Sequence, residues 1–136
     1  MSGVESFLDT SVLLYLLSED TAKADRVEEL LTHPHVISVQ VLNEFAAVAT
    51  RKLAMSFRQV REVLETVRTA CEVEPLTVET HDGGLEVSER LRLSIYDAMI
   101  VASALKAGCR TLYTADLQHH QLISRRLRVV NPFVGG

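Results

Sequence analysis

Apolar residues along the chain occur in two patterns, short continuous runs and helical spacings of three and four positions, and the two patterns alternate. Short apolar runs bounded by turn residues indicate strands, and longer runs with apolar residues three and four positions apart indicate amphipathic helices. The predicted strands comprise residues 4–9, 35–39, 71–77, 110–114 and 127–130. The predicted helices comprise residues 10–18, 21–31, 40–53, 56–70, 78–93 and 97–108. Strands that alternate with helices in this way predict an α/β fold with a parallel sheet covered on both faces.

Residues at the ends of these segments support the helix assignments, and one internal pair weakens one of them. Thr10 or Ser11 can cap the helix that follows the first strand. Gly108 stands at the C-terminal end of the last predicted helix. Gly83 and Gly84 lie inside the fifth predicted helix, and we expect them to weaken or interrupt it.

The chain length of 136 residues predicts one domain, residues 1–136, which is large enough to bury a hydrophobic core. The predicted sheet has about four or five strands. In open parallel sheets, ligands bind beyond the carboxyl ends of the strands, where the strand order reverses. We therefore expect a functional site at that edge.

Composition and charge narrow the choice of partners. Hydrophobic residues make up 47% and charged residues 24%, as in globular proteins, and the formal net charge is −4 at pH 7. A nucleic-acid partner would therefore need a local basic patch or bound cations. Aromatic residues make up only 5% with no Trp, so stacking of bases is not expected to dominate such binding.

The cysteines and the N-terminal region predict a cytoplasmic protein with no membrane segment. Cys71 and Cys109 lie far apart and without metal-ligand spacing, which favours free thiols in a reducing compartment. The first ten residues do not resemble a secretory signal, and the apolar run VLLYLL is too short to span a bilayer.

Three aspartates occupy the ends of apolar segments. Asp9 and Asp116 follow predicted strands, and Asp97 opens an apolar helix. Each position has an ordinary explanation, because Asp caps helices and shapes turns.

Glu44 is harder to explain locally. It lies three residues after Val41 and four before Val48, so it shares their apolar helical face. A carboxylate on such a face is unfavourable unless a cation or a hydrogen-bond donor meets it. A Glu at the edge of the face, which reaches water or pairs with an arginine, is the alternative explanation.

Taken together, the four acids predict a metal site if they converge. Two like charges about 5 Å apart, at an effective dielectric constant of about 20, repel by roughly 3 kcal/mol. A divalent cation would remove this conflict, and an all-oxygen ligand set suits Mg²⁺ or Mn²⁺ better than zinc or copper.

Four stretches of the chain resemble a known family. FLDTSVLLYLL, ISVQVLNEF, YDAMIVASALKAGC and LYTADLQ occur in the order, and at about the spacing, of PIN-domain nucleases, and they resemble the VapC-type toxins of bacterial toxin–antitoxin pairs. The resemblance covers nearly the whole chain, including the closing VVNPF. It implies a PIN-like three-layer α/β/α sandwich and a metal-dependent ribonuclease.

The resemblance also implies roles for individual residues. The residues that match the four acids of the family, and are implied to be catalytic and to hold Mg²⁺ or Mn²⁺, are Asp9, Glu44, Asp97 and Asp116. Thr10 follows the first acid where the family often has Thr or Ser, and Thr114 matches a recurrent hydroxyl that could hold a ligating carboxylate or water.

The segment after Asp116 departs from the family pattern. His120 stands where many relatives have Gly, and no further acid follows Asp116, although some relatives carry one there. These departures concern the shape of the loop and the occupancy of a second metal position.

The implied reaction is hydrolysis of an RNA phosphodiester by a metal-activated water, which leaves 5′-phosphate and 3′-hydroxyl ends. Candidate phosphate contacts are the basic residues Arg51, Lys52, Arg125, Arg126 and Arg128. Solvated surface charge is the alternative explanation for each of them. His119 and His120 lack the partner spacing of a catalytic histidine, so we expect no catalytic role for them.

The family likeness further implies a homodimer and a cognate antitoxin protein whose tail covers the acidic cleft. The apolar stripes of the predicted helices 21–31 and 56–70 could serve such contacts, although core packing explains them equally well. Two other functions remain open. One is a haloacid-dehalogenase-like phosphatase, which normally has a second acid where this chain has Ser11. The other is a PIN-like binding module without cleavage.

Overall fold

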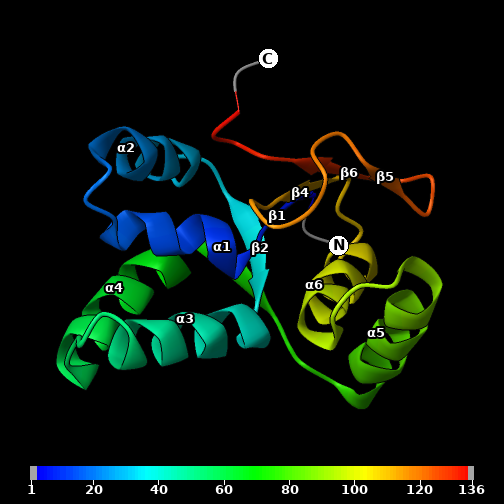
Figure 1. Ribbon diagram of the computed structural model, residues 1–136, viewed down its shortest axis with the longest axis horizontal. Coiled ribbons are helices and arrows are strands. Elements are labelled where there is room, and N and C mark those ends of the chain that lie inside the picture. Colours follow the sequence, from blue (N-terminus) through cyan, green and yellow to red (C-terminus); the bar gives the residue numbers. More distant parts are fainter. Residues whose placement is uncertain (1–2, 135–136) are drawn as a thin grey trace.

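The computed structural model describes residues 3–134, which form one six-stranded sheet with helices on both faces (Figure 1). The strands are β1 (Ser6–Leu8), β2 (His35–Ser38), β3 (Cys71–Glu74), β4 (Thr111–Tyr113), β5 (Leu122–Ile123) and β6 (Leu127–Val130). The helices are α1 (Thr10–Leu13), the 3-10 helix η1 (Leu14–Leu17), α2 (Thr21–Leu30), α3 (Val39–Arg51), α4 (Phe57–Ala70), α5 (Val78–Leu91) and α6 (Ile95–Lys106). This arrangement confirms the predicted α/β class.

The strand order is β3-β2-β1-β4-β6-β5, and all pairings are parallel except that of β5 with β6. The chain moves outward from β1 to β3 and then returns to the other side of β1 for β4. The order therefore reverses between β1 and β4, which is where open sheets of this kind bind ligands. Leu8 pairs with Tyr113, so these two strands end side by side at the same edge.

The helices divide between the two faces of the sheet. In Figure 1, α1 to α4 lie on one side of the strands and α5 and α6 on the other. Right-handed crossovers that run in opposite directions across a sheet place their helices on opposite faces. Between the layers, the large side chains Phe7, Leu8, Ile37, Phe45 and Leu112 are fully buried.

The sheet has six strands rather than about four or five. The additional strand, β5, has two residues and pairs antiparallel with β6 across a tight turn. A run this short shows no alternation of apolar and polar residues, so the sequence pattern did not indicate it. The helix predicted for residues 10–18 is one α-helical turn followed by the 3-10 turn η1.

The Gly83–Gly84 pair does not interrupt α5, which is continuous from Val78 to Leu91. A Cβ atom at Gly84 would lie 2.5 Å from the sulfur of Met99 in α6, whereas one at Gly83 would meet only the Cβ of Ala102, at 3.7 Å. Gly84 therefore permits α5 and α6 to pack closely, and this packing stabilises a helix that its own propensity disfavours.

The last helix ends as predicted. Gly108 has φ +77°, and its N–H donates to the carbonyl of Leu105. The left-handed conformation that a glycine adopts readily thus closes α6. Among the described residues, no helix has the length and apolar character needed to cross a membrane.

Candidate active site

Asp9 follows β1 directly and is the N-cap of α1, so the cap is Asp9 itself and not Thr10 or Ser11, the other two candidates. Its side chain is 4% exposed and accepts three hydrogen bonds. The donors are the Thr10 N–H at 2.7 Å, the Ser11 hydroxyl at 3.0 Å and the Thr114 hydroxyl at 2.7 Å. Burial raises the pKa of Asp9 to about 6, against the lowering effect of these donors and together with the negative charge of Asp116. Asp9 is therefore rigidly held in a place that disfavours its charge.

Thr114 joins the ends of the two central strands. It follows β4, is completely buried, and accepts a hydrogen bond from the Asp116 N–H at 3.1 Å while it donates to Asp9. The Ser11 hydroxyl likewise accepts from the Ala115 N–H at 3.0 Å. Two hydroxyl groups thus fix the loop after β4 against the start of α1.

Asp116 lies in that loop at the mouth of the site. Its side chain is exposed on one side, and partial desolvation followed by the charge of Asp97 raises its pKa above the ordinary value. Two acids that are distant in the sequence therefore influence one another directly.

Glu44 lies in the second turn of α3 and is half-buried. Desolvation is the largest cause of its raised pKa, and the negative charges of Asp97 and Asp116 add to it. The Gln40 amide, which donates to Glu44 at 2.8 Å, lowers the pKa, and so does the side chain of Thr10. The alternative that Glu44 pairs with an arginine is not what the structure shows, since its hydrogen-bond donor is an amide.

Asp97 lies in the first turn of α6 but does not cap the helix. Ser94 is the N-cap, and its hydroxyl accepts from the Asp97 N–H at 3.2 Å. The Asp97 carboxylate is therefore free of capping, and its charge acts on Glu44 and Asp116.

These positions bring the four acids to the carboxyl edge of the central strands. A cavity of about 420 Å³ at this edge is lined by Asp9, Thr10, Ser11, Leu14, Tyr15, Glu44, Val48, Ala115 and Asp116. Asp97 does not line this cavity, but it lies close enough to two of the acids to raise their pKa values. Burial of the carboxylates, to which like-charge repulsion adds, is thus the main electrostatic feature of the site.

The donor set fits a hard divalent cation in its chemistry. All candidate ligands are carboxylate or hydroxyl oxygens, which Mg²⁺ and Mn²⁺ prefer. Within residues 3–134, no three acidic, histidine or cysteine side chains are close enough to form a closed metal cage. Carboxylates that repel one another are expected to stand further apart than they would around a cation.

The basic residues predicted to contact RNA fall into two groups. Arg51 and Lys52 end α3, seven and eight positions after Glu44 and on the same helical face, about 11 Å along the axis. Val48, between them and Glu44, lines the acidic cavity. This group therefore lies on the helix that carries Glu44, about two turns beyond it.

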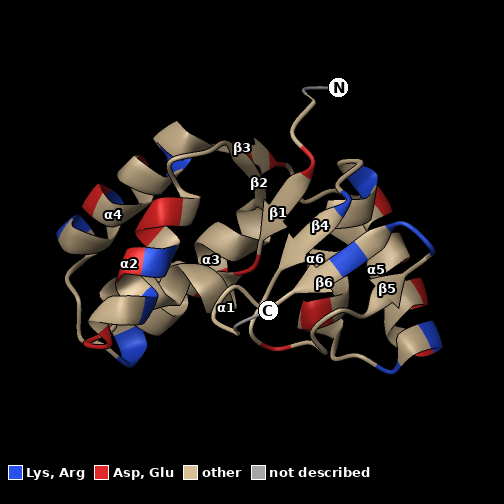
Figure 2. Cartoon of the chain, turned by 90° about the horizontal axis from the view of Figure 1, so that it is seen from above, with Lys and Arg blue, Asp and Glu red and all other residues tan. Residues whose placement is uncertain are grey.

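The second group lies elsewhere. Arg125 and Arg126 form the turn before β6, at the amino edge of the sheet and thus opposite the acids. The Arg126 guanidinium donates to the Leu105 carbonyl at the far end of α6, and Arg128 donates to the His120 carbonyl at 2.8 Å. Figure 2 shows the basic segment of β6 apart from the basic segments of α2 and α4. The structure does not bring Arg125 and Arg126 together with the acids.

His119 and His120 have structural contacts in the loop after Asp116. Their rings stack with centroids 3.7 Å apart, and His119 Nδ1 accepts from the Asn131 N–H at 2.9 Å. His120 has φ +70°, in the region that favours glycine. The backbone therefore keeps the conformation that a Gly would adopt there.

Two residues of the site were missed or underestimated from the sequence. Gln40 lies four positions before Glu44, a spacing that places the two side chains on one helical face. Ser11 was considered only as a helix cap, yet its hydroxyl bonds Asp9 and the loop after β4. The i, i+4 spacing was a visible indication for Gln40, whereas no local pattern indicated the role of Ser11.

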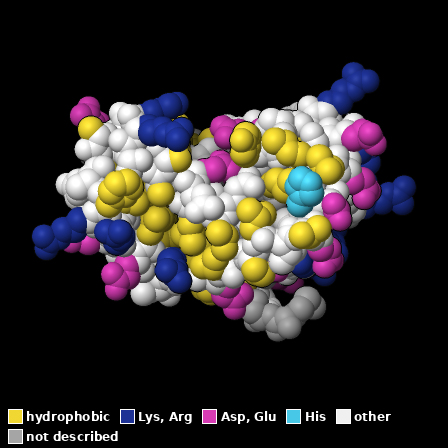
Figure 3. Space-filling model, turned by 90° about the horizontal axis from the view of Figure 1, so that it is seen from below, with side chains coloured by type: hydrophobic (Ala, Val, Ile, Leu, Met, Phe, Trp, Pro, Cys, Tyr) yellow, Lys and Arg dark blue, Asp and Glu magenta, His cyan; other side chains and the backbone are white. Residues whose placement is uncertain are grey.

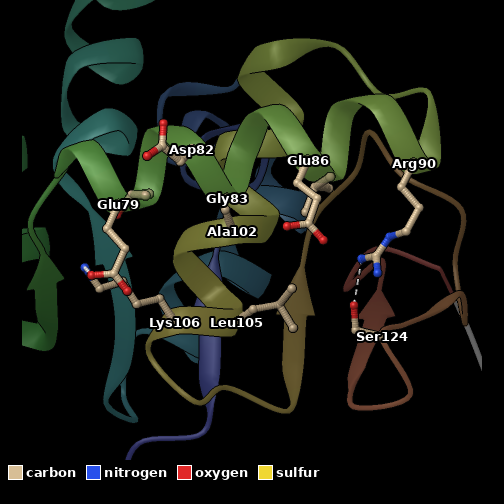
Figure 4. Close-up of a pocket in the computed structure, with 11 residues that line it drawn as sticks. Glu79, Asp82, Gly83, Glu86, Arg90, Ala102, Leu105, Lys106 and Ser124 are labelled. Carbon is tan, nitrogen blue, oxygen red and sulfur yellow. Dashed lines mark hydrogen bonds and ion pairs between the residues drawn. The ribbon is translucent and has the colours of Figure 1, made fainter.

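A larger hollow, of about 560 Å³, lies between α5 and α6 (Figure 4). Its basic side chains have contacts of their own: Lys106 pairs with Glu79 at 3.6 Å, and Arg90 donates to the Ser124 hydroxyl at 2.9 Å. Size alone does not identify a site, and the smaller acidic cavity is the one whose carboxylates have perturbed pKa values.

Several solved structures that are similar to this chain are described as toxins or toxin–antitoxin complexes. VapC20 of Mycobacterium tuberculosis, described as a Sarcin-Ricin loop cleaving toxin, is 22% identical with a TM-score of 0.65, over 82% of this chain and 90% of that one. A toxin–antitoxin complex from Klebsiella pneumoniae is 17% identical with a TM-score of 0.72, over 95% and 98% of the two chains. VapBC2 of Rickettsia felis, bound to a DNA fragment from their promoter, is 18% identical with a TM-score of 0.67, over 94% and 100%. At these identities the likeness shows a shared fold.

At the level of sequence, no curated protein matches the chain. The PIN domain family model does match it, over residues 6–123. That span includes both central strands and all four acids at the edge where the strand order reverses. The chain therefore belongs to the PIN-domain family.

Proposed function

We propose that this protein is a Mg²⁺- or Mn²⁺-dependent endoribonuclease. The observation that supports this most is the gathering of acids from four separate segments at the switch point of the sheet, where burial and, to a lesser extent, neighbouring negative charges raise the pKa values of Asp9, Glu44 and Asp116. A structural role gives no reason to collect unneutralised carboxylates in one place. Membership of the PIN-domain family agrees with a nuclease.

The cation would be held by the carboxylates of Asp9, Glu44, Asp97 and Asp116. A bound divalent ion supplies a water of lowered pKa and neutralises charge on the leaving oxygen. The residues of the chain do the orienting: Ser11, Thr114 and the Thr10 N–H hold both oxygens of Asp9 in place. Preorganised ligands of this kind do not have to be reordered when the substrate arrives.

Arg51 and Lys52 are the proposed phosphate contacts, because they lie on the same face of α3 as Glu44. Both are exposed, and neither forms an ion pair within residues 3–134. An RNA strand that enters the acidic cavity could thus be met by positive charge about two helical turns away.

The test is cleavage of RNA by the purified protein with Mn²⁺ or Mg²⁺, with and without EDTA. We expect metal-dependent cleavage that leaves 5′-phosphate and 3′-hydroxyl ends, and no cleavage by the Asp97→Asn variant although it remains folded. Products with 2′,3′-cyclic phosphate would show that the ribose hydroxyl is the nucleophile and would contradict the proposed mechanism. Metal-independent cleavage would contradict it as well.

An apolar hollow on the surface supports the proposal of a protein partner. A hollow of about 410 Å³ between η1, α2 and α4 is lined mainly by the apolar residues Leu16, Leu17, Leu31, Val63 and Val67. Figure 3 shows apolar side chains gathered in a strip across one face of the molecule. Since similar structures are toxin–antitoxin complexes, we propose that the chain is the toxin of such a pair, forms a homodimer and binds an antitoxin.

Co-expression with the neighbouring reading frame tests the toxin role. We expect its product to co-purify with this chain and to suppress the metal-dependent cleavage. Cleavage that is unaffected by every neighbouring product would leave the nuclease activity in place and remove the toxin assignment.

The phosphatase alternative has no support in the site. Ser11 stands two residues after Asp9, where that class normally has an acid, and its hydroxyl bonds Asp9 and the Ala115 N–H. Turnover of p-nitrophenyl phosphate without RNA cleavage would reverse this judgement.

A further inference from the structure

Gln40 connects the two helices that carry Glu44 and Asp97. It lies in the first turn of α3 and is only 9% exposed. Its side-chain nitrogen donates to Glu44 Oε1 at 2.8 Å and to the backbone carbonyl of Tyr96 at 2.9 Å. Tyr96 immediately precedes Asp97 in the first turn of α6.

The chemistry of these two contacts requires the amide. Both partners are acceptors, so the nitrogen and not the oxygen of Gln40 must face them, and both of its N–H groups are used. An apolar side chain of the same size would leave a half-buried carboxylate without its donor. A carboxylate at this position would face the carboxylate of Glu44 and repel it.

The geometry determines where Glu44 stands relative to Asp97. Glu44 and Asp97 are both carboxylates, and like charges repel. Without a tether, Glu44 would be free to turn toward solvent. The Gln40 amide holds one of its oxygens and is itself anchored on α6, so hydrogen bonds through an uncharged side chain set the separation of the two acids.

We propose that Gln40 is a positioning residue that holds Glu44 in place for the metal and for the RNA reaction. The inference rests on the proposed function, since it assigns Gln40 a role in that same site. Hydrogen-bond partners that orient ligating carboxylates typically change metal affinity or activity by about 10- to 100-fold when they are removed.

The alternative is that Gln40 only fills space in the core. Asn43 provides a matched control, because it is an amide on the same helix that is exposed to solvent. The variants Gln40→Met and Asn43→Met both replace an amide by an unbranched apolar side chain. Only the first removes the bridge between α3 and α6.

The experiment measures three quantities for each variant: Mn²⁺ affinity by electron paramagnetic resonance, kcat and KM for RNA cleavage, and thermal unfolding in EDTA. For Gln40→Met we expect Mn²⁺ affinity and kcat to fall by about tenfold or more, with KM within about twofold of the native value. Asn43→Met should leave all three close to native. Native Mn²⁺ affinity and kcat in a folded Gln40→Met variant would overturn the proposal.

A double-mutant cycle separates positioning from packing. In a Glu44→Gln background, Gln40→Met should cause little further loss of Mn²⁺ affinity, because its effect acts through Glu44. An equal loss in both backgrounds would show that Gln40 acts by general packing, which overturns the inference.

One readout depends neither on the folding of a variant nor on the nuclease proposal. In the metal-free native protein, the side-chain amide protons of Gln40 should exchange slowly with deuterium, as expected of buried and bonded groups. Fast exchange of both protons would refute the bridge. A native protein that neither binds Mn²⁺ nor cleaves RNA, but shows slow exchange, would instead refute the proposed function and with it the role, although not the bridge itself.

Discussion

At the scale of single residues, Asp9 shows how the site stores unfavourable energy. Three donors hold a carboxylate that burial would prefer to be protonated, and its pKa is raised from 3.8 to about 6. The folded state therefore binds a proton between these values that the unfolded state has lost. The contribution of Asp9 to stability is present below about pH 4 and is lost as the pH rises through 6.

Replacement of Asp9 by Asn should therefore stabilise the metal-free protein at neutral pH. A shift of about two pKa units corresponds to about 3 kcal/mol. We therefore expect the free energy of unfolding of the variant in EDTA to exceed that of the native protein by about 1–3 kcal/mol at pH 7, and to differ little from it at pH 4. Thermal and urea unfolding at the two pH values measure this, and RNA cleavage by the variant should be lost. The exposed Asp25→Asn serves as control. A variant that is less stable than the native protein at pH 7 would contradict the burial argument.

At the scale of elements, the close packing of α5 against α6 depends on Gly84 and not on the adjacent Gly83. Gly84 faces Met99 closely, whereas Gly83 has ordinary van der Waals space beside Ala102. The two glycines thus have the same helix propensity but different surroundings. Sequence reasoning treated them alike, because the orientation of each on the helix surface only matters once the partner helix is present.

The effects of Gly83→Ala and Gly84→Ala on the free energy of unfolding should consequently differ in sign or size. Gly83→Ala should stabilise the protein by about 0.5–1 kcal/mol through helix propensity. Gly84→Ala gains the same propensity but must displace the Met99 side chain, and overpacking typically costs about 1–3 kcal/mol. Urea denaturation of the pair tests the difference, and equal stabilities would show that α6 adjusts freely.

The loop after Asp116 allows a second test at this scale. His120 has a left-handed backbone, which costs a residue with a Cβ roughly 1–2 kcal/mol. His120→Gly should relieve this strain and raise the free energy of unfolding by about 0.5–1 kcal/mol after the entropy of the added glycine is counted. A destabilised variant would show that the stacking with His119 outweighs the backbone strain.

At the scale of the whole molecule, the topology separates the two groups of basic residues. The parallel register places the turn before β6 at one edge of the sheet and the acids at the other. The proposed binding of RNA by a chain of net charge −4 requires local attraction, and α3 is the element that leads from the acids to exposed positive charge. The sequence alone grouped all five cations together.

The salt dependence of RNA binding, measured with Ca²⁺ or without metal to prevent cleavage, should therefore distinguish two double variants. Arg51→Ala with Lys52→Ala should make the negative slope of log affinity against log salt less steep by about 1, as expected for one or two lost contacts with single-stranded RNA. Arg125→Ala with Arg126→Ala should leave the slope unchanged. The reverse outcome would place the RNA path across β6 and away from α3.

The sequence by itself determined the α/β class and, apart from β5, the order of the strands and helices, and it named the four acids as candidates. Periodic burial and strand-end positions are local properties, and the family motifs are contiguous in the chain. Only the tertiary structure decided that Ser94 caps α6 in place of Asp97, that Gly84 admits Met99, and that Gln40 spans from Glu44 to Tyr96. The contacts of Gly84 and Gln40 depend on different elements meeting in space, at distances set by packing of the whole chain. The Ser94 cap is a contact within one helix turn, for which Ser94 and Asp97 are both suitable residue types.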